Sequence, residues 1–187
     1  MRRRAALALI ALAPAPARAE GAMAQVMAAL AAVPAASATF VEEKELPELD
    51  RPLLSRGLLF WRAPDRLEKL TLEPFEERLL VEGDRLLLEL PARGQRQDLT
   101  LDTAPEIRPL VEAIRATLAG DAATLAAHHR IAFTGDLARW RMVLTPRSVR
   151  VLAAVQRIVL EGEGASLLVV ETEGREGRSR LRASPRG

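Results

Sequence analysis

The 187-residue sequence contains no cysteine, no tyrosine and two histidines, and aromatic residues make up only 3% of it. Without cysteine the chain cannot form disulfide bonds, thiolate metal sites or a cysteine nucleophile, and it cannot carry the acylated cysteine of a lipoprotein. His128 and His129 are adjacent, and because neighbours on a helix diverge by about 100° they do not easily share a metal ion. We interpret them as polar residues near a helix end, where a cation is tolerated.

The sequence also lacks the short motifs of common catalytic sites. No serine lies in a G-x-S-x-G turn, and no glycine-rich loop precedes a helix. The acidic pairs Glu42-Glu43 and Glu76-Glu77 lie in or beside expected strands, where neighbouring side chains point to opposite faces, so we interpret them as solvated edges. We therefore predict no catalytic residue, no metal site and no cofactor.

The N-terminus has the order of a secretory signal peptide. Three arginines at residues 2–4 precede a short apolar stretch, residues 5–13, and Ala17-Arg18-Ala19 follows. The apolar stretch is much shorter than the ~20 residues that a membrane-spanning helix needs. We predict a signal peptide over residues 1–19, a single domain over residues 20–187, and an exported mature protein.

Removal of this leader would change the charge balance. The whole chain has 27 lysines and arginines against 25 acids, and residues 1–19 hold four of the arginines and none of the acids. The mature chain would therefore have 23 bases against 25 acids, a net charge of −2. The high pI, which is typical of nucleic-acid-binding proteins, comes from the leader, so we predict no nucleic acid partner.

Apolar periodicity and turn residues predict a chain of short strands interrupted by helices. Connections this short indicate antiparallel neighbours, and a sheet of about ten or eleven strands tends to curl. The expected fold is mainly β with α (α+β), a single strongly curved antiparallel sheet or incomplete barrel. The expected helices cover residues 22–33, 107–118 and 122–129, and the expected strands cover residues 39–46, 54–62, 66–73, 77–82, 85–90, 95–101, 130–134, 139–145, 154–161, 166–173 and 178–182.

Several of these strands are apolar on both faces. Residues 57–61, 86–88 and 167–170 place bulky apolar side chains on consecutive positions, although a half-buried strand should alternate. A sheet in water cannot expose two apolar faces to solvent, so one face is expected to lie against the N-terminal helix or a partner. The other face forms either an ordinary packed core or the lining of an apolar cavity. Few aromatics and many small aliphatic residues would suit acyl chains more than planar ligands.

Two motifs point to a family. Residues 57–67 read GLLFWRAPDRL and residues 79–86 read LLVEGDRL. They resemble the G-x-L-x-[apolar]-[K/R]-x-P strand and the [I/L]-L-V-x-[D/E]-G-x-x-L hairpin of the periplasmic LolA family of outer-membrane lipoprotein carriers. The stretches APDRLEK at residues 63–69 and LAGD at residues 118–121 are more similar to a divergent LolA-related branch.

The resemblance implies an incomplete barrel with a helical lid, whose apolar cavity carries the acyl chains of a lipoprotein across the periplasm without ATP. It also implies an inner-membrane donor protein, an outer-membrane acceptor protein and a monomeric carrier. The divergent branch accompanies genes for aryl-polyene or related lipid export, which leaves the cargo open between a lipoprotein and another lipid. The side chains expected to line the cavity or lid are Leu59, Trp61, Leu70, Leu72, Leu80, Leu88, Leu110, Ile114, Leu118, Phe133 and Trp140.

One residue departs from the family pattern. Classical carriers place an arginine directly before the motif proline, where it bonds to the lid, but here that position is Ala63. Arg62 should point to the opposite face. The resemblance therefore implies a lid that is held in a different way.

Two other functions stay open on the sequence. The same fold could serve a sensor or assembly module that binds a lipid or peptide without transporting it. An enzyme acting on an exported lipid is the third hypothesis, which would need a titratable group facing the cavity.

Overall fold

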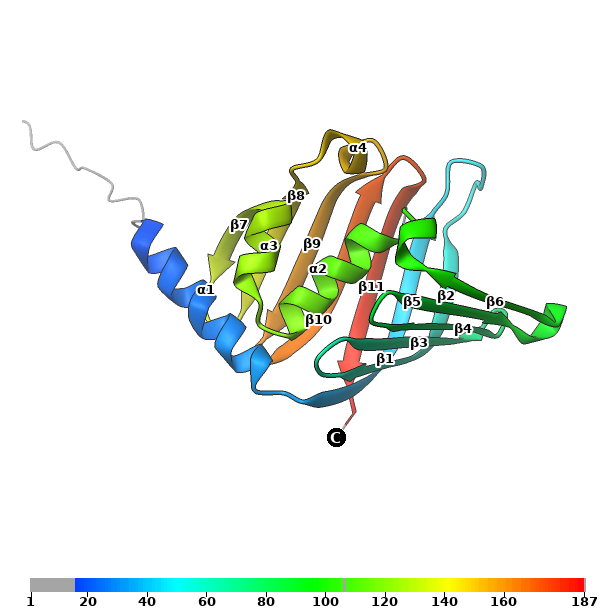
Figure 1. Cartoon of the computed structure of the whole chain (residues 1–187), viewed down its shortest axis with the longest axis horizontal. Helices are drawn as coiled ribbons and strands as arrows, with labels where there is room; N and C mark the ends of the chain where they lie inside the picture. Colours follow the sequence, from blue (N-terminus) through cyan, green and yellow to red (C-terminus); the bar gives the residue numbers. More distant parts are fainter. Residues whose placement is uncertain (1–15, 106, 187) are drawn as a thin grey trace, which may run out of the picture.

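The computed structural model describes residues 16–105 and 107–186. All eleven strands in this part of the chain belong to one antiparallel sheet, in the order β6-β5-β4-β3-β2-β1-β11-β10-β9-β8-β7. The edge strands β6 and β7 do not pair with each other, so the sheet is curved but open (Figure 1). The predicted fold class is confirmed.

The strands follow the turn residues closely. Three of them, β3, β4 and β5, begin and end at the predicted residues, because proline or glycine-aspartate turns flank each one. Strand β11 is longer than predicted, since it pairs along its length with β1 and so joins the two ends of the chain. The bounds are β1 (Ala35–Glu45), β2 (Leu53–Arg62), β3 (Arg66–Glu73), β4 (Glu77–Glu82), β5 (Arg85–Leu90), β6 (Gln95–Thr100), β7 (His129–Gly135), β8 (Trp140–Pro146), β9 (Val155–Glu163), β10 (Ser166–Gly174) and β11 (Gly177–Pro185).

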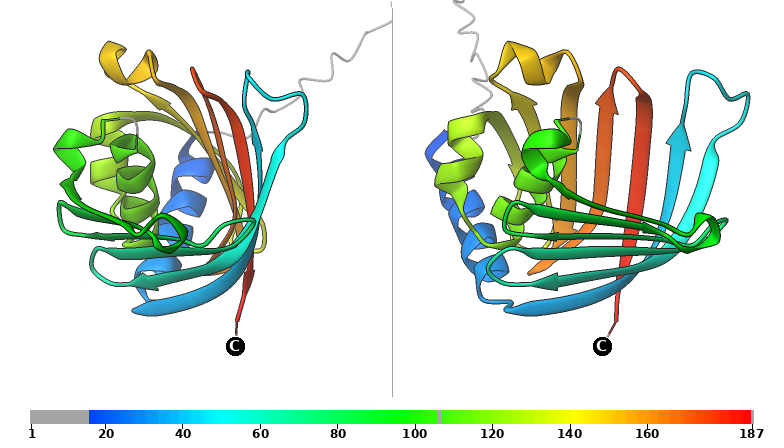
Figure 2. Two further views of the ribbon diagram at one scale, coloured as in Figure 1. Left: turned by 90° about the vertical axis from the view of Figure 1, so that its right-hand side faces the viewer. Right: turned by 45° about the vertical axis from the view of Figure 1, so that its right-hand side comes forward.

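Three helices lie on one side of the sheet. Figure 2 shows the sheet curving around α1 (Pro16–Ala31), α2 (Arg108–Leu118) and α3 (Ala122–His128). We call this side the concave face and the opposite side the outer face. A fourth helix, α4 (Val149–Leu152), joins β8 to β9 and was not predicted. Two short 3-10 helices, η1 (Pro91–Arg93) and η2 (Leu101–Thr103), flank β6.

The predicted signal peptide lies mostly outside the described residues. Helix α1 begins at Pro16 and therefore includes Ala17 to Ala19. Within the described residues, no helix is long and apolar enough to cross a membrane.

The LAGD stretch at the end of α2 has a structural role. Gly120 adopts a φ of 69°, and a Cβ there would lie 2.5 Å from the carbonyl oxygen of Met27 in α1, so only glycine fits this close approach of the two helices. The carboxylate of Asp121 accepts a hydrogen bond from the backbone N–H of Thr124 at 2.9 Å and caps α3.

The main core lies at the β7–β10 end of the concave face. Apolar side chains of all three helices pack there against β8 and β9, and β7 and β10 add half-buried residues at the margin. Each large apolar side chain fully buried in this way stabilises the fold by about 1.5–3 kcal/mol. We call this group the large cluster; its buried members are Val26, Met27, Leu30, Ala113, Ala116, Leu125, Trp140, Met142, Leu144, Val155, Ile158 and Leu160.

A second core lies at the other end of the sheet. Val81 of β4 and Leu86 of β5 pack against Leu101, Ala104 and Val111. We call this the small cluster. Helix α2 therefore reaches both ends of the sheet, with Val111 in the small cluster and Ala113 and Ala116 in the large one.

Candidate functional site

The middle of the concave face lies between the two clusters. Among the described residues, the central strands β11, β1 and β2 contribute no side chain to either cluster. The strand register nevertheless places a continuous set of concave-face residues on them. We call this set the middle floor; it consists of Ala38, Phe40, Glu42, Ser55, Gly57, Leu59, Trp61, Ser179, Leu181 and Ala183.

The middle floor is largely apolar and incompletely covered. Phe40 and Trp61 are buried, whereas Leu59, Leu181 and Ala183 are only half-buried. Trp61 is fixed at one end of β2, where its indole N–H donates to the carbonyl of Val33 at 3.3 Å. The floor therefore offers hydrocarbon surface that the protein's own core does not fully use.

Helix α2 connects the clusters on either side of this floor. Ile114 is half-buried but belongs to neither cluster, although Val111, three residues earlier, packs in the small cluster and Leu118, four residues later, packs against the large one. Residues with this spacing share one face of a helix. Ile114 is thus the apolar side chain of α2 between the two packed regions.

We call strands β3–β6 the wing. Arg115 ties α2 to two turns, at Asp65 just before β3 and at Gly83 between β4 and β5. Its guanidinium donates to the carbonyl oxygen of Gly83 at 2.7 Å and lies 3.4 Å from the carboxylate of Asp65. The same Asp65 carboxylate accepts the N–H of Gly83 at 3.1 Å. Helix α2 therefore supplies an arginine, and Asp65, two residues after Ala63, supplies its acceptor.

A polar group lies within the apolar floor. The carboxylate of Glu42 accepts hydrogen bonds from Lys69 Nζ, from Ser179 Oγ at 2.6 Å and from Ser55 Oγ at 3.4 Å. Burial raises the pKa of Glu42, but the ammonium and the hydroxyl donors outweigh burial, so its pKa lies below the ordinary value. The Lys69 ammonium also lies 5.0 Å from the centre of the Phe40 ring.

The two histidines play different parts. His128 is exposed at the end of α3, as expected, whereas His129 is only 4% exposed at the start of β7. Burial lowers the pKa of His129 below its ordinary value and favours the neutral ring. Within the described chain, no group of three or more histidine, aspartate or glutamate side chains could hold a metal ion.

The sequence also matches a family model. The model, described as outer membrane lipoprotein carrier protein LolA-like, covers residues 14–182. The chain belongs to the LolA-like family. No curated protein sequence matches the chain.

Solved structures with a similar fold come from several bacteria. A LolA superfamily protein of Nitrosomonas europaea is 12% identical with a TM-score of 0.47, and the match covers 89% of this chain and 91% of that one. The Mycobacterium tuberculosis lipoprotein LppX is 10% identical with a TM-score of 0.49, covering 91% and 95%. Pseudomonas aeruginosa MucB, solved in complex with MucA, is 15% identical with a TM-score of 0.46, covering 86% of this chain and 55% of that one.

Within this LolA-like fold, part of the predicted lining set lies on the concave side. Leu59, Trp61 and Leu88 are on the concave face of their strands, and Ile114 is a half-buried residue of α2. The other predicted residues on this side belong to the large cluster or its margin. Trp140 is a buried member, and Phe133, Leu110 and Leu118 pack against it.

Three predicted residues lie on the wrong side of the sheet. Leu70 pairs with Leu58, and Leu80 lies opposite Glu68, so Leu70, Leu72 and Leu80 share the outer face. On β3 it is Leu67, Lys69 and Thr71 that face the helices. The concave positions Lys69 and Thr71 of β3 are polar, whereas Leu79 and Val81 of β4 are apolar, so apolar character alone does not separate the two faces of these strands.

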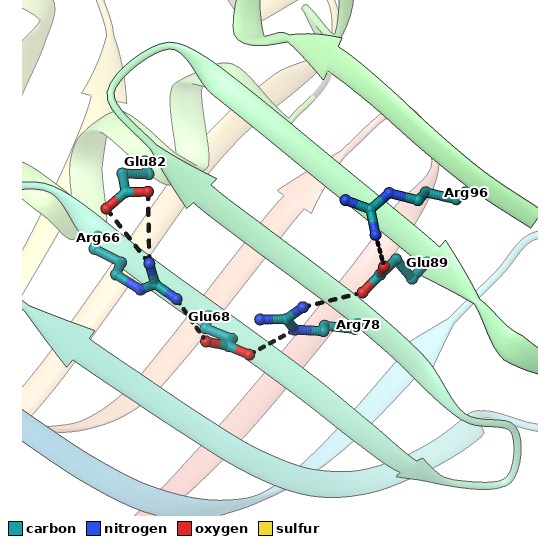
Figure 3. A network of polar contacts seen from close by, with 6 residues as sticks. All are labelled: Arg66, Glu68, Arg78, Glu82, Glu89 and Arg96. Atoms are coloured by element: carbon teal, nitrogen blue, oxygen red, sulfur yellow. Dashed lines mark hydrogen bonds and ion pairs between the residues drawn. The ribbon is translucent and has the colours of Figure 1, made fainter.

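The outer face of this wing is a ladder of ion pairs. Figure 3 shows Arg78 between Glu68 and Glu89, with the contacts at 2.7 and 3.1 Å. Arg66 joins Glu68 and Glu82, and Arg96 joins Glu89. An open hollow of about 380 Å³ is lined by Leu70, Glu76, Glu77, Arg78, Glu89, Pro91, Gly94, Gln95 and Arg96. None of its lining residues belongs to either cluster, and it lies over the ion pairs of the outer face.

The sequence-based prediction missed Phe40 and the Glu42–Lys69 pair. Phe40, Glu42 and Lys44 alternate along β1 on the concave face, and this period-two pattern was available in the sequence. The pairing of Glu42 with Lys69, two strands away, was not available, since it depends on the register of β1, β2 and β3.

Proposed function

We propose that this protein is a periplasmic carrier that binds the acyl chains of a lipid or lipoprotein between the middle floor and helix α2. The observation that supports this most directly is the placement of half-buried apolar residues between two packed clusters. Leu59 and Leu181 of the floor and Ile114 of α2 belong to neither cluster. Each methylene that such a surface removes from water contributes about 0.8 kcal/mol to the binding free energy. An acyl chain with many methylenes would therefore bind well.

The proposal extends to the route of the cargo. A signal peptide over residues 1–19 would direct the protein to the periplasm. We expect it to act there as a monomer. There it would take cargo from an inner-membrane donor protein and deliver it to an outer-membrane acceptor protein. The LolA-like family membership supports a carrier role in general. The ion pair of Arg115 with Asp65 supports a helix that can close over the cargo and be released without ATP.

Native mass spectrometry of protein purified without detergent tests binding directly. We expect adducts with the mass of a lipid or acylated peptide. Absence of any adduct, together with no uptake of added lipid, would contradict the proposal. A single stable protein partner without lipid would favour the sensor or assembly module instead.

Ile114→Asp tests the location of the site. A carboxylate facing hydrocarbon should weaken acyl-chain binding by at least about tenfold, equivalent to about 1.4 kcal/mol, with a smaller loss of folding stability. Val149→Asp on α4 is the matched control, because Val149 is 81% exposed and lies outside both clusters. Equal losses of binding and of stability in the Ile114 variant would show that this residue is ordinary core.

A further inference from the structure

The two lysines of the chain have an unusual distribution. Every other base is an arginine or a histidine, and the only lysines are Lys44 and Lys69. In the strand register both lie on the concave face, Lys44 opposite Ser179 and Lys69 opposite Leu59. The arginines of β11, in contrast, lie on the outer face, where Arg180 and Arg182 pair with acids.

Lys69 reaches the middle floor by crossing β2 at Gly57, which has no side chain. Lys69 is on β3 and Glu42 is on β1, and the intervening strand β2 has Gly57 between Phe40 and Thr71 in the register. A Cβ at Gly57 would lie 1.9 Å from the carbonyl oxygen of Leu70. This glycine therefore permits close packing of β2 and β3 and leaves the floor open for the lysine.

The ammonium of Lys69 has more unused hydrogen-bonding capacity than the carboxylate of Glu42. Among the described residues, Lys69 Nζ has one hydrogen-bond partner, Glu42, although an ammonium has three N–H donors. Glu42 accepts from Lys69 and from two serine hydroxyls. Glu42 would therefore keep two hydrogen-bond donors if Lys69 turned away. The Lys69 side chain is also more exposed than that of Glu42, at 25% against 16%.

The other charges on this part of the concave face are few. Lys44 adds a positive charge to the pair, and Glu77, opposite Thr71 at the start of β4, adds a negative one. A partly buried ion pair among apolar side chains adds little stability, since desolvation offsets much of the attraction. This leaves room for a role of the pair in ligand recognition.

We propose that Lys69 is an anchor for an anionic oxygen group, carboxylate or phosphate, at the polar end of an acyl-chain ligand on the middle floor. This inference rests on the proposed function, and it restricts the cargo to amphiphiles with a negative head group. The ligand oxygens would accept the two free N–H groups of Lys69, Glu42 would stay bound to Ser55 and Ser179, and the chain would lie along Leu59 and Leu181 beneath Ile114.

Titration calorimetry with three probes of equal chain length tests the anchor: laurate, dodecyl phosphate and dodecanol. We expect both anions to bind about tenfold or more tightly than dodecanol, as one charge-assisted hydrogen bond allows. The comparison of laurate with dodecyl phosphate distinguishes a fatty-acid ligand from a phospholipid-like one. Equal affinity for all three would overturn the anchor and leave the proposed function intact. If none binds, the proposed function fails as well.

Variants assign the preference to Lys69. Lys69→Met leaves Glu42 without its cation, so the double variant Glu42→Gln/Lys69→Met is measured beside it to avoid an unpaired buried charge. Both should lose the preference for anions and keep dodecanol binding, and Lys69→Arg should retain the preference. Arg182→Met removes the same charge from the outer face and should change nothing. Persistence of the preference in the double variant would overturn the assignment.

Discussion

The two ends of the curved sheet are stabilised in different ways. At the β7–β10 end, three helices bury a continuous apolar cluster against the sheet. At the β3–β6 end, a cluster of five buried residues is accompanied by a ladder of arginine–glutamate pairs on the outer face. The first end resembles the core of an ordinary globular domain, and the second is a thin wing attached to it by the central strands and by α2.

This difference has a consequence for the candidate site. The middle floor lies where the well-packed end meets the wing, and α2 crosses from one to the other. A region with few buried apolar contacts opens at a lower free energy than a dense core. The wing is therefore the part expected to move when a ligand enters or leaves, and the β7–β10 end is the support against which it moves.

The largest expected effect compares the two clusters directly. Leu160→Ala in the large cluster should lower the free energy of unfolding by about 4 kcal/mol, and Leu86→Ala in the small cluster by roughly 2–3 kcal/mol, because a thin cluster relaxes around the cavity more completely. Both leucines are at most 1% exposed, which makes the pair well matched. Denaturant unfolding measures both values. Equal losses would show that the wing is as firmly packed as the other end.

A smaller effect is expected where the wing is tied to helix α2. Arg115→Met should cost about 1.5 kcal/mol, the lower end of the range for hydrogen bonds to charged groups, because both side chains are partly exposed. Amide hydrogen exchange should accelerate in α2 and in the turns that contain Asp65 and Gly83, with little change in β8 and β9. Arg139→Met is the control, because Arg139 pairs with Glu163 but is 84% exposed. Uniform acceleration over the whole sheet would contradict a local tie.

The smallest effect is expected on the outer face of the wing. Arg78→Met should lower stability by less than about 1 kcal/mol at low salt, since the pairs it joins are partly exposed. The loss should shrink further in 1 M salt, where exposed charges are screened. Thermal unfolding at two salt concentrations measures both. A loss as large as that of Leu86→Ala would mean that the ion-pair ladder, and not the small cluster, holds the wing together.

Much of the secondary structure could be predicted because its signals are local. The bounds of β3, β4 and β5 follow from turns with proline or glycine at each end, and the α2–α3 boundary follows from Gly120 and Asp121. Helix α4 was missed because four residues are too short to show a helical period. The length of β11 was missed because its pairing partner, β1, lies more than 130 residues earlier in the chain.

The candidate site shows where local signals end. Alternation along β2 places Leu59 and Trp61 on one face of the strand and Leu58 and Phe60 on the other, because the geometry of a single strand fixes its two faces. Alternation within one strand does not show that Leu70, on β3, shares the outer face with Leu58. That relation depends on the register across the β2–β3 pair, which includes an irregularity between Arg56 and Gly57.

The sequence alone determined the order of strands and helices, the open curved sheet and the resemblance to lipoprotein carriers, because periodicity, turns and short motifs are written in neighbouring residues. Only the tertiary structure decided which face of each strand meets the helices. It also decided that Arg115 of α2 meets Asp65, in the turn at the motif proline, and that Lys69 meets Glu42 in the middle floor. These contacts join residues 27 and 50 positions apart, and their geometry is set by sheet register and helix docking, which no local pattern encodes.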